Sequence, residues 1–471
     1  MKKVHMIGIG GTGLSAIARV LLEMGYAVTG SDRVETPFIH ELRTAGATIA
    51  IGHSPENVGA VDAVIRSSAI PDTNPEVSAA RERGIPVLKR ADFLGELMAG
   101  KTGVAVAGTH GKTTTTAMLA WVLTALEQEP TFIAGGVLNE LHTNAHAGKG
   151  NLFVIEADEY DHMFLGLKPS IEVITNVEHD HPDCFPTPQD FQDAFVDFVR
   201  LLPPDGTLVA CADDPGARSM LLEAQAFERN VIAYGIQTQA EAGQPGLQTF
   251  TTSLNANEHG GFTFTATVLG KPTTTVLQVP GRHNVQNALA VLSVIGLLGL
   301  DLGEASAALS QFTGTGRRFE VRGKAGGVFV IDDYAHHPTE IKATLSAART
   351  RYPNQRIWTV WQPHTFSRTQ TLFEEFTLAF GDADFVIVTE IYAARETNPG
   401  FSARNVVEAM SHPAVKFIPR FSEVCNYLVS NLRPGDVLLV LSAGDGDTIS
   451  TSVLTCLRES EEKNGRNKAR I

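Results

Sequence analysis

Short apolar stretches alternate with helical patterns in the first part of the chain. Three stretches have the length and β-branched content of buried strands, at Val4–Ile9, Ala27–Thr29 and Val61–Ile65. Between the first two lies a helical stretch at Leu14–Glu23. This strand-helix-strand order predicts a parallel sheet flanked by helices over residues 1–99.

Residues 100–313 combine parallel and antiparallel signals. The predicted strands and helices of this region are Val104–Ala107, Thr114–Leu126, Leu152–Ile155, Ile171–Thr175 and Asn284–Leu298. A Thr- and Gly-rich part, Thr249–Val279, is typical of antiparallel strands. The region is therefore predicted to be a central domain with a mixed sheet.

Residues 314–471 return to an α/β pattern. The predicted strands are Val328–Ile331, Ile357–Val360, Phe385–Val388 and Val437–Leu441, and the charged tail from Arg458 is expected to fray. A length of 471 residues agrees with about three domains at roughly 150 residues each. We predict an α/β protein with a Rossmann-like first domain, a central domain of the phosphate-loop ATPase type and a Rossmann-like C-terminal domain.

Composition and charge exclude several classes of protein. The 38 basic and 52 acidic residues give a net charge of −14, which argues against nucleic-acid binding because that needs a basic face. The four cysteines have no C-x-x-C spacing, so neither a disulfide framework nor a zinc knuckle is indicated. No apolar stretch reaches the length of a membrane-spanning helix, and we expect a cytosolic protein.

The first strand ends in a glycine-rich turn, Gly8-Ile9-Gly10-Gly11-Thr12-Gly13. Such a turn brings backbone N–H groups and a helix N-terminus close to a diphosphate. Asp32 follows about 20 residues later, where a carboxylate commonly binds a ribose hydroxyl. Taken alone, these residues favour NAD; a different diphosphate ligand, or a turn that serves only helix packing, are the alternatives.

A second glycine turn follows the strand Val104–Ala107 and leads into a helix. Its sequence is Gly108-Thr109-His110-Gly111-Lys112-Thr113-Thr114, a shortened form of the phosphate-loop pattern. Lys112 can reach the β- and γ-phosphates, and a following Thr hydroxyl can hold Mg²⁺. The sequence therefore predicts phosphate hydrolysis or transfer from a nucleotide, and we expect ATP.

Acidic and histidine side chains follow two further strands. Glu156, Asp158 and Glu159 come at the end of Leu152–Ile155, where an open α/β sheet binds ligands. Glu156 is the predicted Mg²⁺ ligand, and His181, after the next strand, is a candidate for a second metal. A zinc site with Cys184 has only two soft ligands and is disfavoured.

Three later clusters carry polar groups suited to nucleotide or substrate contacts. Asn284 and Asn287 share one helical face and can bond a base or ribose, although Asn284 can equally be a helix N-cap. Arg317 and Arg318 offer guanidinium donors for phosphate. The segments 332–340 and 361–369 each follow a strand, which makes a site at these strand ends more probable than a structural role.

Taken together, the chain resembles the Mur ligases, cytoplasmic enzymes of peptidoglycan precursor synthesis. The resemblance rests on six stretches in family order: Gly8–Gly13, Ala107–Thr113, Glu156–Glu159, Pro280–Asn284, Gly316–Phe319 and Asp333–Glu340. It implies an ATP-dependent, ADP-forming ligase that joins L-alanine to UDP-N-acetylmuramate through an acyl phosphate. It also implies ATP and Mg²⁺, or Mn²⁺, as cofactors, no nucleic-acid or membrane partner, and a monomer or homodimer.

The resemblance also assigns residues to sites. The first turn is expected to hold the UDP diphosphate instead of NAD, and the UDP-sugar set is Gly8, Gly10, Gly11, Thr12, Gly13, Asp32 and Ser67. The ATP set is Gly108, Thr109, His110, Gly111, Lys112, Thr113, Thr114, His283, Asn284, Asn287 and Arg317. The metal ligands are Thr113, Glu156 and His181, and the catalytic set is Lys112, Glu156, His181, His336 and Arg368. Amino-acid contacts are Asp333, Tyr334, His336 and His337 in the C-terminal domain.

The chain departs from the family pattern at three places. Tyr160 stands where alanine-adding members carry Ser, and the same run resembles the ligase that attaches recycled murein tripeptide. Thr365 replaces a common Arg, and residues 442–447 only approximate the family's G-A-G-D. The tripeptide ligase is therefore the main alternative; an NAD-dependent oxidoreductase and a non-catalytic nucleotide switch are more distant ones.

Overall fold

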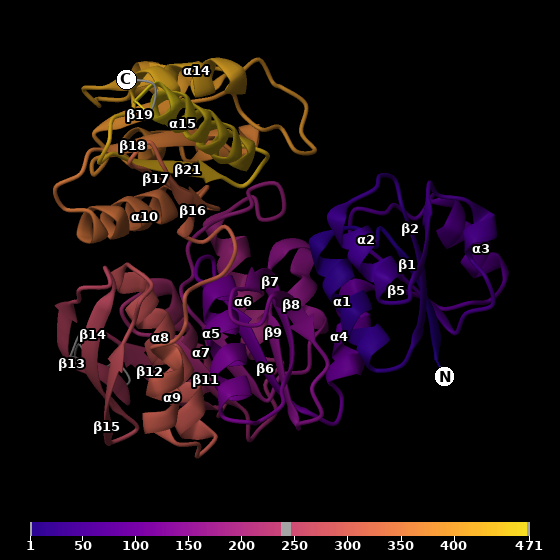
Figure 1. Cartoon of the computed structure of the whole chain (residues 1–471). Helices are drawn as coiled ribbons and strands as arrows, with labels where there is room; N and C mark the ends of the chain where they lie inside the picture. Colours follow the sequence, from indigo (N-terminus) through magenta and orange to yellow (C-terminus); the bar gives the residue numbers. More distant parts are fainter. Residues whose placement is uncertain (1, 237–245, 469–471) are drawn as a thin grey trace.

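Three sheets follow one another along the chain (Figure 1). The structure, a computed structural model, describes residues 2–236 and 246–468. The first sheet is fully parallel with strand order β3-β2-β1-β4-β5. Its strands are β1 (Lys3–Ile7), β2 (Ala27–Asp32), β3 (Thr48–Ile51), β4 (Ala63–Arg66) and β5 (Val87–Lys89). Its helices are α1 (Thr12–Glu23), α2 (Pro37–Thr44), η1 (Pro55–Asn57), α3 (Pro75–Glu82) and α4 (Arg90–Met98).

The central sheet has ten strands in the order β15-β14-β13-β12-β11-β10-β6-β9-β7-β8. They are β6 (Thr102–Ala107), β7 (Thr131–Leu138), β8 (Thr143–His146), β9 (Leu152–Glu156), β10 (Ile171–Ile174), β11 (Thr207–Cys211), β12 (Asn230–Gly235), β13 (Thr249–Ala256), β14 (Phe262–Val268) and β15 (Lys271–Val276). The middle of the sheet is parallel, and antiparallel pairs β13–β14, β14–β15 and β7–β8 lie at its edges. The mixed sheet and its antiparallel part were predicted; β7, β8, β11 and β12 were not.

Helices surround the central sheet and include the one that follows the phosphate loop. They are α5 (Lys112–Ala125), η2 (Tyr160–Gly166), α6 (Pro188–Val199), α7 (Pro215–Ala226), α8 (Arg282–Leu297) and α9 (Leu302–Leu309). Helix α5 is largely buried, because it packs against β7, α8 and α9. The start of α5 therefore has a rigid support.

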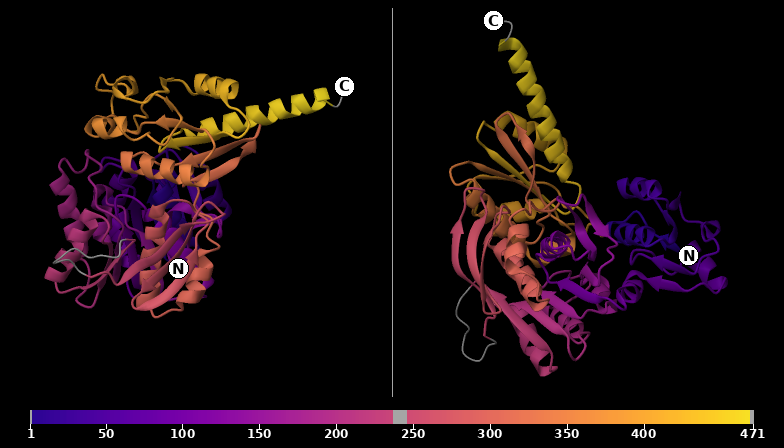
Figure 2. Two further views of the ribbon diagram at one scale, coloured as in Figure 1. Left: turned by 90° about the vertical axis from the view of Figure 1, so that its left-hand side faces the viewer. Right: turned by 60° about the horizontal axis from the view of Figure 1, so that its bottom comes forward.

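The third sheet has the order β16-β17-β21-β18-β19-β20, parallel except for β16. Its strands are β16 (Glu320–Ala325), β17 (Val328–Asp333), β18 (Ile357–Gln362), β19 (Phe385–Val388), β20 (Val415–Phe417) and β21 (Val437–Ser442). Its helices are α10 (Pro338–Arg351), α11 (Phe366–Thr371), α12 (Phe373–Thr377), α13 (Ala403–Ala409), α14 (Phe421–Asn431) and α15 (Asp447–Lys468). The tail expected to fray from Arg458 instead continues α15, which projects from the body of the molecule (Figure 2).

The apolar cores divide the molecule unevenly. One continuous buried cluster runs through the first and central sheets, joined where α1 packs on β7 and β8 and α4 packs on η2. The third sheet has separate clusters on its two faces. The C-terminal part is therefore an independent apolar unit that meets the central part mainly through polar side chains. None of the helices in the described ranges has the length and apolar character that a bilayer span needs.

Candidate active site

The phosphate loop lies between the end of β6 and the start of α5. Gly108 has φ +133°, and a Cβ there would lie 2.1 Å from Thr175 Oγ1. Gly111 has φ +82° and forms the N-cap of α5. The backbone N–H of His110 donates to Asn176 Oδ1 (2.8 Å), which anchors the loop to the segment after β10. Both glycines are thus required by backbone conformation, and Gly108 also by space.

Lys112 turns back onto its own loop. Its Nζ donates to the carbonyl oxygens of Gly108 (2.5 Å) and Thr109 (3.0 Å) and to Glu159 Oε1 (3.0 Å). Burial lowers the pKa of Lys112, but the carboxylates of Glu159 and Asp158 outweigh it and raise the pKa above its ordinary value. The loop therefore holds a charged ammonium at the position where a phosphate would gather.

Thr113 and Glu156 form a pair of hard oxygen donors beside this ammonium. Thr113 Oγ1 donates to Glu156 Oε1 (2.9 Å), and the backbone N–H of Gly135 donates to Oε2 (2.6 Å). Mg²⁺ prefers such hydroxyl and carboxylate oxygens. His181 approaches the same carboxylate as Lys112, with Nε2 3.6 Å from Glu159 Oε1. The three predicted metal ligands thus lie at the same edge of the central sheet. The carboxylates closest to His181 are those of Glu159 and Asp180.

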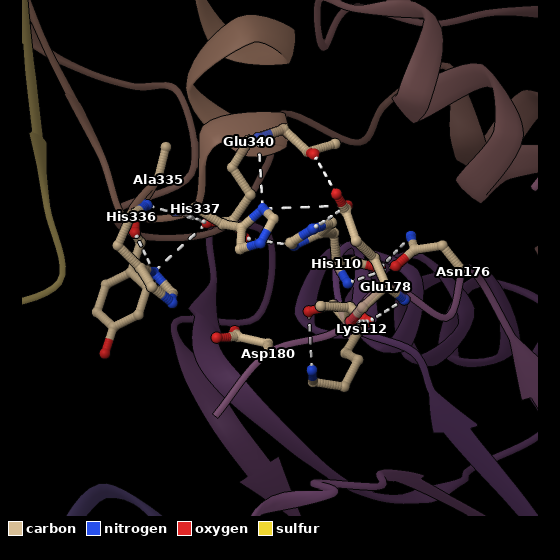
Figure 3. A network of polar contacts seen from close by, with 12 residues as sticks. His110, Lys112, Asn176, Glu178, Asp180, Ala335, His336, His337 and Glu340 are labelled. Atoms are coloured by element: carbon tan, nitrogen blue, oxygen red, sulfur yellow. Dashed lines mark hydrogen bonds and ion pairs between the residues drawn. The ribbon is translucent and has the colours of Figure 1, made fainter. Parts of the chain in front are cut away.

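His110 joins the central part to the C-terminal part (Figure 3). Its Nε2 lies 3.1 Å from Glu178 Oε2, and its Nδ1 lies 3.3 Å from Glu340 Oε1 on α10. Burial disfavours the charged ring, but the hydrogen bonds to the two carboxylates outweigh it and raise the pKa of His110 to about 9. Thr339 Oγ1 adds a hydrogen bond to Glu178 Oε1 (2.8 Å) across the same boundary.

A second cluster, His110, Glu178 and His337, also holds the imidazole and carboxylate groups that commonly bind a metal. Their ligand atoms lie within 4.8 Å of one another. However, both ring nitrogens of His110 already face carboxylates, and Nδ1 of His337 accepts from the backbone N–H of Thr339 (3.3 Å). A protonated His110 balances the charge of Glu178, so we assign no metal to this cluster.

Hydrogen bonds at the N-terminal end of α10 hold His336 and His337 in place. Glu340 Oε2 accepts from the backbone N–H groups of His336 (3.0 Å) and His337 (3.3 Å), and His337 is the N-cap. His336 Nδ1 lies 2.9 Å from the carbonyl oxygen of Tyr334. Burial lowers the pKa of His336 to about 3, so its ring is neutral. His337 therefore has a capping role, whereas His336 keeps its Nε2 as an acceptor.

Arg368 makes the second polar contact between the two parts. Its Nε donates to Asp180 Oδ1 (2.7 Å), and both side chains are 4% exposed. Nη2 of Arg368 lies 3.5 Å from His181 Nδ1, and Nη1 lies 3.1 Å from His364 Nδ1. Although burial favours the neutral carboxyl, the guanidinium holds the pKa of Asp180 well below its usual range. The pair brings a C-terminal cation next to the predicted second metal ligand.

A cavity of about 670 Å³ opens beside the phosphate loop, between α8 and α10. Its lining includes the predicted residues His110, Gly111, Thr114, His283, Asn284 and Asn287. Asn287 Nδ2 donates to Asn284 Oδ1 (3.0 Å), and Asn284 Nδ2 donates to the Pro280 carbonyl (2.7 Å). The two amides therefore form a fixed pair at the cavity wall, as the shared helical face predicted.

The first glycine turn belongs to a separate site at the edge of the first sheet. The backbone N–H of Gly10 donates to Asp32 Oδ2 (2.8 Å), so this carboxylate supports the turn. No side chain caps α1 at Gly11, and its first turn contains no acidic residue. Ser67 follows β4 beside the same turn, with its Cβ 3.2 Å from the place of a Gly8 Cβ. The N–H groups of residues 8–11 are bonded within the protein, so the groups available to an anion are those in the first turn of α1, at an uncapped helix N-terminus.

Comparison with known proteins identifies the family of the chain. Residues 3–102 match the model described as Mur ligase family, catalytic domain; residues 106–295 match the Mur ligase middle domain; residues 317–444 match the Mur ligase, glutamate ligase domain. The chain belongs to the Mur ligase family. The UDP-N-acetylmuramate–L-alanine ligase of Solidesulfovibrio magneticus is 44% identical over 94% of this chain and 96% of its own length. That of Salinibacter ruber is 43% identical over 94% of this chain and 93% of its own length.

Solved structures give the same assignment. The UDP-N-acetylmuramate-alanine ligase MurC of Thermotoga maritima has a TM-score of 0.80 and 30% identity, covering 98% of this chain and 100% of that one. A murein peptide ligase of Psychrobacter arcticus has a TM-score of 0.70 and 25% identity, covering 97% and 99%. The three-domain α/β architecture of this Mur ligase, as predicted from its sequence, is therefore confirmed.

Adjacent arginines of this Mur ligase have different environments. Arg317, the predicted ATP contact, donates through Nη2 to the carbonyl oxygens of Ser442 (2.7 Å) and Gly444 (3.2 Å). Arg318 lines the cavity instead, with Nη1 3.6 Å from Glu340 Oε1. Arg317 has φ +59°, in the left-handed region. Both guanidinium groups also stack over the ring of Tyr334.

Asp333 supports the loop that carries the histidines. Its two oxygens accept from the backbone N–H groups of Phe319 (2.7 Å) and Ala335 (2.7 Å). Burial raises the pKa of Asp333 to about 6. The carboxylate thus positions Tyr334 and the following loop, and it also belongs to the lining of the cavity. Its expected contact with the amino acid stays a prediction.

Sequence reasoning assigned no role to four polar residues of the site, Glu159, Glu178, Asp180 and Glu340, and it put Arg317 rather than Arg318 in the ATP set. Each lay inside a segment that had been singled out, but the choice within the segment depended on side-chain direction. A usable signal existed for Glu340, which follows His337 by three residues in the spacing of a capping box. Asp180 and Arg368 are 188 residues apart, and no local pattern predicts their contact.

Proposed function

We propose that this protein is an ATP-dependent ligase that joins L-alanine to UDP-N-acetylmuramate in cytoplasmic peptidoglycan precursor synthesis. The observation that carries the proposal is the charged Lys112 beside the Thr113–Glu156 oxygen pair. Its partner Glu159 lies 3.6 Å from His181, and His181 lies 3.5 Å from Arg368 of the C-terminal part. This arrangement combines a γ-phosphate site with a separate site for a carboxylate and an amine. Its substrates come from the names of relatives at 44% identity over nearly the full chain.

The reaction needs an activated carboxylate. A carboxylate oxygen of the muramic acid attacks the γ-phosphorus of ATP, the bond to the β-phosphate oxygen breaks, and ADP leaves. The ammonium of Lys112 stabilises the negative charge that builds on the transferred phosphoryl group. Bound Mg²⁺, or Mn²⁺, held by Thr113 and Glu156 and, for a second ion, by His181, would supply further charge neutralisation between the two anions.

The amine of L-alanine then attacks the acyl carbon, the C–O bond to the phosphate breaks, and the proton that the nitrogen loses leaves with the phosphate. His336 donates its Nδ1–H to the Tyr334 carbonyl, which leaves the Nε2 lone pair free to accept a hydrogen bond from the amine. Its low pKa keeps the ring neutral for this purpose. Arg368, held by Asp180, provides a cation for the amino-acid carboxylate or the departing phosphate. Domain limits of 1–99, 100–313 and 314–471 then correspond to UDP-sugar, ATP and amino-acid functions.

The decisive experiment is phosphate release with ATP, Mg²⁺ and UDP-N-acetylmuramate, scanned over L-Ala, L-Ser, Gly and the murein tripeptide. We expect release with L-Ala that depends on the UDP-sugar. Release with tripeptide and none with L-Ala would identify the recycling ligase instead, and ATP binding without any release would identify a nucleotide switch. NAD binding at the first turn without UDP-sugar would favour an oxidoreductase.

Lys112→Ala tests the separation of the two sites. Loss of the ammonium is expected to reduce phosphate release at least 100-fold, while UDP-sugar binding measured by calorimetry stays within about threefold. Lys271→Ala, at an exposed position on β15, is the matched control. Equal loss of both activities would contradict the assignment of separate sites.

A further inference from the structure

Arg90 lies against the first turn of α1, although it belongs to α4. Its Nη1 is 2.1 Å from the position that a Cβ at Gly13 would take, and the three atoms nearest to that position all belong to Arg90. Gly13 has no positive φ, so its backbone does not require glycine. The guanidinium of Arg90 therefore fills the space that a side chain at position 13 would occupy, which explains why this position is a glycine.

This position is electrostatically unfavourable for a cation in the absence of an anion. The N-terminal end of a helix carries partial positive charge, which destabilises a cation placed there. Within the described residues, the contact that offsets this is Asp158, whose Oδ2 lies 3.2 Å from Arg90 Nη2. The Nε of Arg90 is buried and has no hydrogen-bond partner among these residues. Nη1, the guanidinium nitrogen nearest to the Gly13 position, forms no hydrogen bond within the described residues, so Arg90 has a free donor beside the turn.

Asp158 connects Arg90 to the ATP site. Its other oxygen, Oδ1, accepts from the backbone N–H of Tyr160 (3.2 Å), and the residue lies between Glu156 and Glu159 in sequence. The packing of α4 on η2 keeps the two segments together. A ligand that binds Arg90 is therefore connected, through Asp158, to the segment that carries the predicted Mg²⁺ ligand Glu156 and Glu159, the partner of Lys112.

We propose that Arg90 binds the diphosphate of the UDP-sugar at the N-terminus of α1 and that Asp158 holds the guanidinium in place. The fork of Arg90 supplies the charge that the backbone N–H groups of the turn lack. Arg90 is thus a diphosphate-binding residue supplied from outside the glycine motif. The inference rests on the proposed function, because it takes the UDP-sugar as the ligand of the first turn.

The test compares three probes by titration calorimetry: UDP-N-acetylmuramate, UDP and uridine. Arg90→Met is expected to weaken the first two 10- to 100-fold and to leave uridine within twofold, because only the diphosphate contact is lost. Arg90→Lys keeps the positive charge but lacks the two-pronged guanidinium. Its affinity for UDP is expected to lie between those of the wild type and Arg90→Met. Arg19→Met removes another arginine–carboxylate pair, between Arg19 on α1 and Glu41 on α2, and is the matched control, expected to match the wild type.

Gly13→Ala provides an independent route to the same result. The added methyl displaces the guanidinium while leaving its charge in the protein, so UDP binding should fall at least tenfold. The double variant Gly13→Ala/Arg90→Met should bind UDP no more weakly than Arg90→Met alone. Additive losses would overturn the proposal, because the methyl would then act on the ligand directly.

Other outcomes separate this inference from the proposed function. UDP binding by Arg90→Met within twofold of the wild type would overturn the role of Arg90 alone. Equal losses for uridine and UDP would show a structural role and would also overturn it. If the wild-type protein binds neither UDP nor UDP-N-acetylmuramate, the proposed function itself fails.

Discussion

Buried charges at the active site of this Mur ligase have close partners of opposite sign. Lys112 has Glu159, His110 has Glu178 and Glu340, and Asp180 has Arg368. These pairs keep ionised groups out of water where a phosphate and a carboxylate are to meet. In each pair, a hydrogen bond to the partner satisfies the buried charge. Removal of one side chain therefore leaves the other as an uncompensated buried charge.

Glu172 on β10 differs from these residues. Its side chain is fully buried, and neither carboxyl oxygen has a hydrogen-bond partner among the described residues. Burial raises the pKa of Glu172 well above its ordinary value. The folded protein then binds more protons than the unfolded chain above about pH 4.5, so the free energy of unfolding falls as the pH rises toward the folded-state pKa.

We expect Glu172→Met to raise the free energy of unfolding at pH 8 by about 1–3 kcal/mol. The gain should shrink toward pH 4, where the carboxyl is protonated in both states. Urea unfolding of wild type and variant at both pH values measures this difference, with Glu258→Met at an exposed position as the control. A variant that is less stable than the wild type at pH 8 would show that Glu172 has a stabilising partner in solution.

At the scale of elements, the site is made by strand ends and by the helices that start there. β6, β9 and β10 are adjacent and parallel in the central sheet, so the residues after each strand reach the same edge. α5 and α10 begin at this edge, one from each side of the cavity. The loop between β6 and α5 can adopt its path at this edge because Gly108 and Gly111 take positive φ angles that other residues rarely take.

Gly111→Ala is expected to weaken ATP binding at least tenfold. Alanine at φ +82° is strained by about 1–2 kcal/mol, and its Cβ would lie 2.8 Å from Asn287 Oδ1 at the cavity wall. Gly299→Ala is a matched control, because it has φ +71° but no atom within 4 Å of the added Cβ. Calorimetric titration with ATP, together with thermal unfolding of both variants, separates the collision from the backbone strain. Equal effects of the two substitutions on ATP affinity would contradict the role of the collision.

At the scale of the whole molecule, the first and central parts share an apolar core, whereas the C-terminal part is attached through polar contacts. The contacts across this boundary include His110–Glu340, Thr339–Glu178 and Arg368–Asp180. Polar contacts can be exchanged for contacts with a ligand or water more readily than an apolar core can be opened. The C-terminal part is therefore the element expected to move.

The charge on His110 makes this closed arrangement dependent on pH. Its pKa is raised from 6.5 to about 9 by Glu178 and Glu340 against the cost of burial, and His337 is the further titratable group that faces it. A raised folded-state pKa gives a stabilisation that is complete below about pH 6.5 and is lost as the pH rises through about 9. The shift corresponds to a free energy on the order of 3 kcal/mol.

We therefore expect the radius of gyration, measured by X-ray scattering, to increase between pH 7 and pH 10 as the C-terminal part separates. In His110→Gln the radius should be larger at pH 7 and should change less with pH. His259→Gln, at an exposed position outside this boundary, should behave as the wild type does. Parallel pH curves for wild type and His110→Gln would contradict the role assigned to this ion pair.

Local patterns in the sequence were sufficient for the three-part α/β architecture and for the phosphate loop. Strand length, glycine position and helix spacing are properties of neighbouring residues, and they predicted β6, α5 and the shared face of Asn284 and Asn287. Short strands at sheet edges, such as β8 and β20, carry few apolar residues and were missed. The fraying expected at Arg458 did not allow for the helix propensity of the acidic residues that follow.

The sequence by itself thus determined the chemistry available to this protein, because glycine turns, a lysine after a glycine and acids at strand ends act through local backbone geometry. Only the tertiary structure decided which charged groups meet. Arg318 rather than Arg317 faces the cavity, Asp180 binds Arg368, and Arg90 from α4 occupies the space above Gly13. Those contacts join residues from different elements that lie far apart in the sequence, and their geometry depends on how whole elements pack.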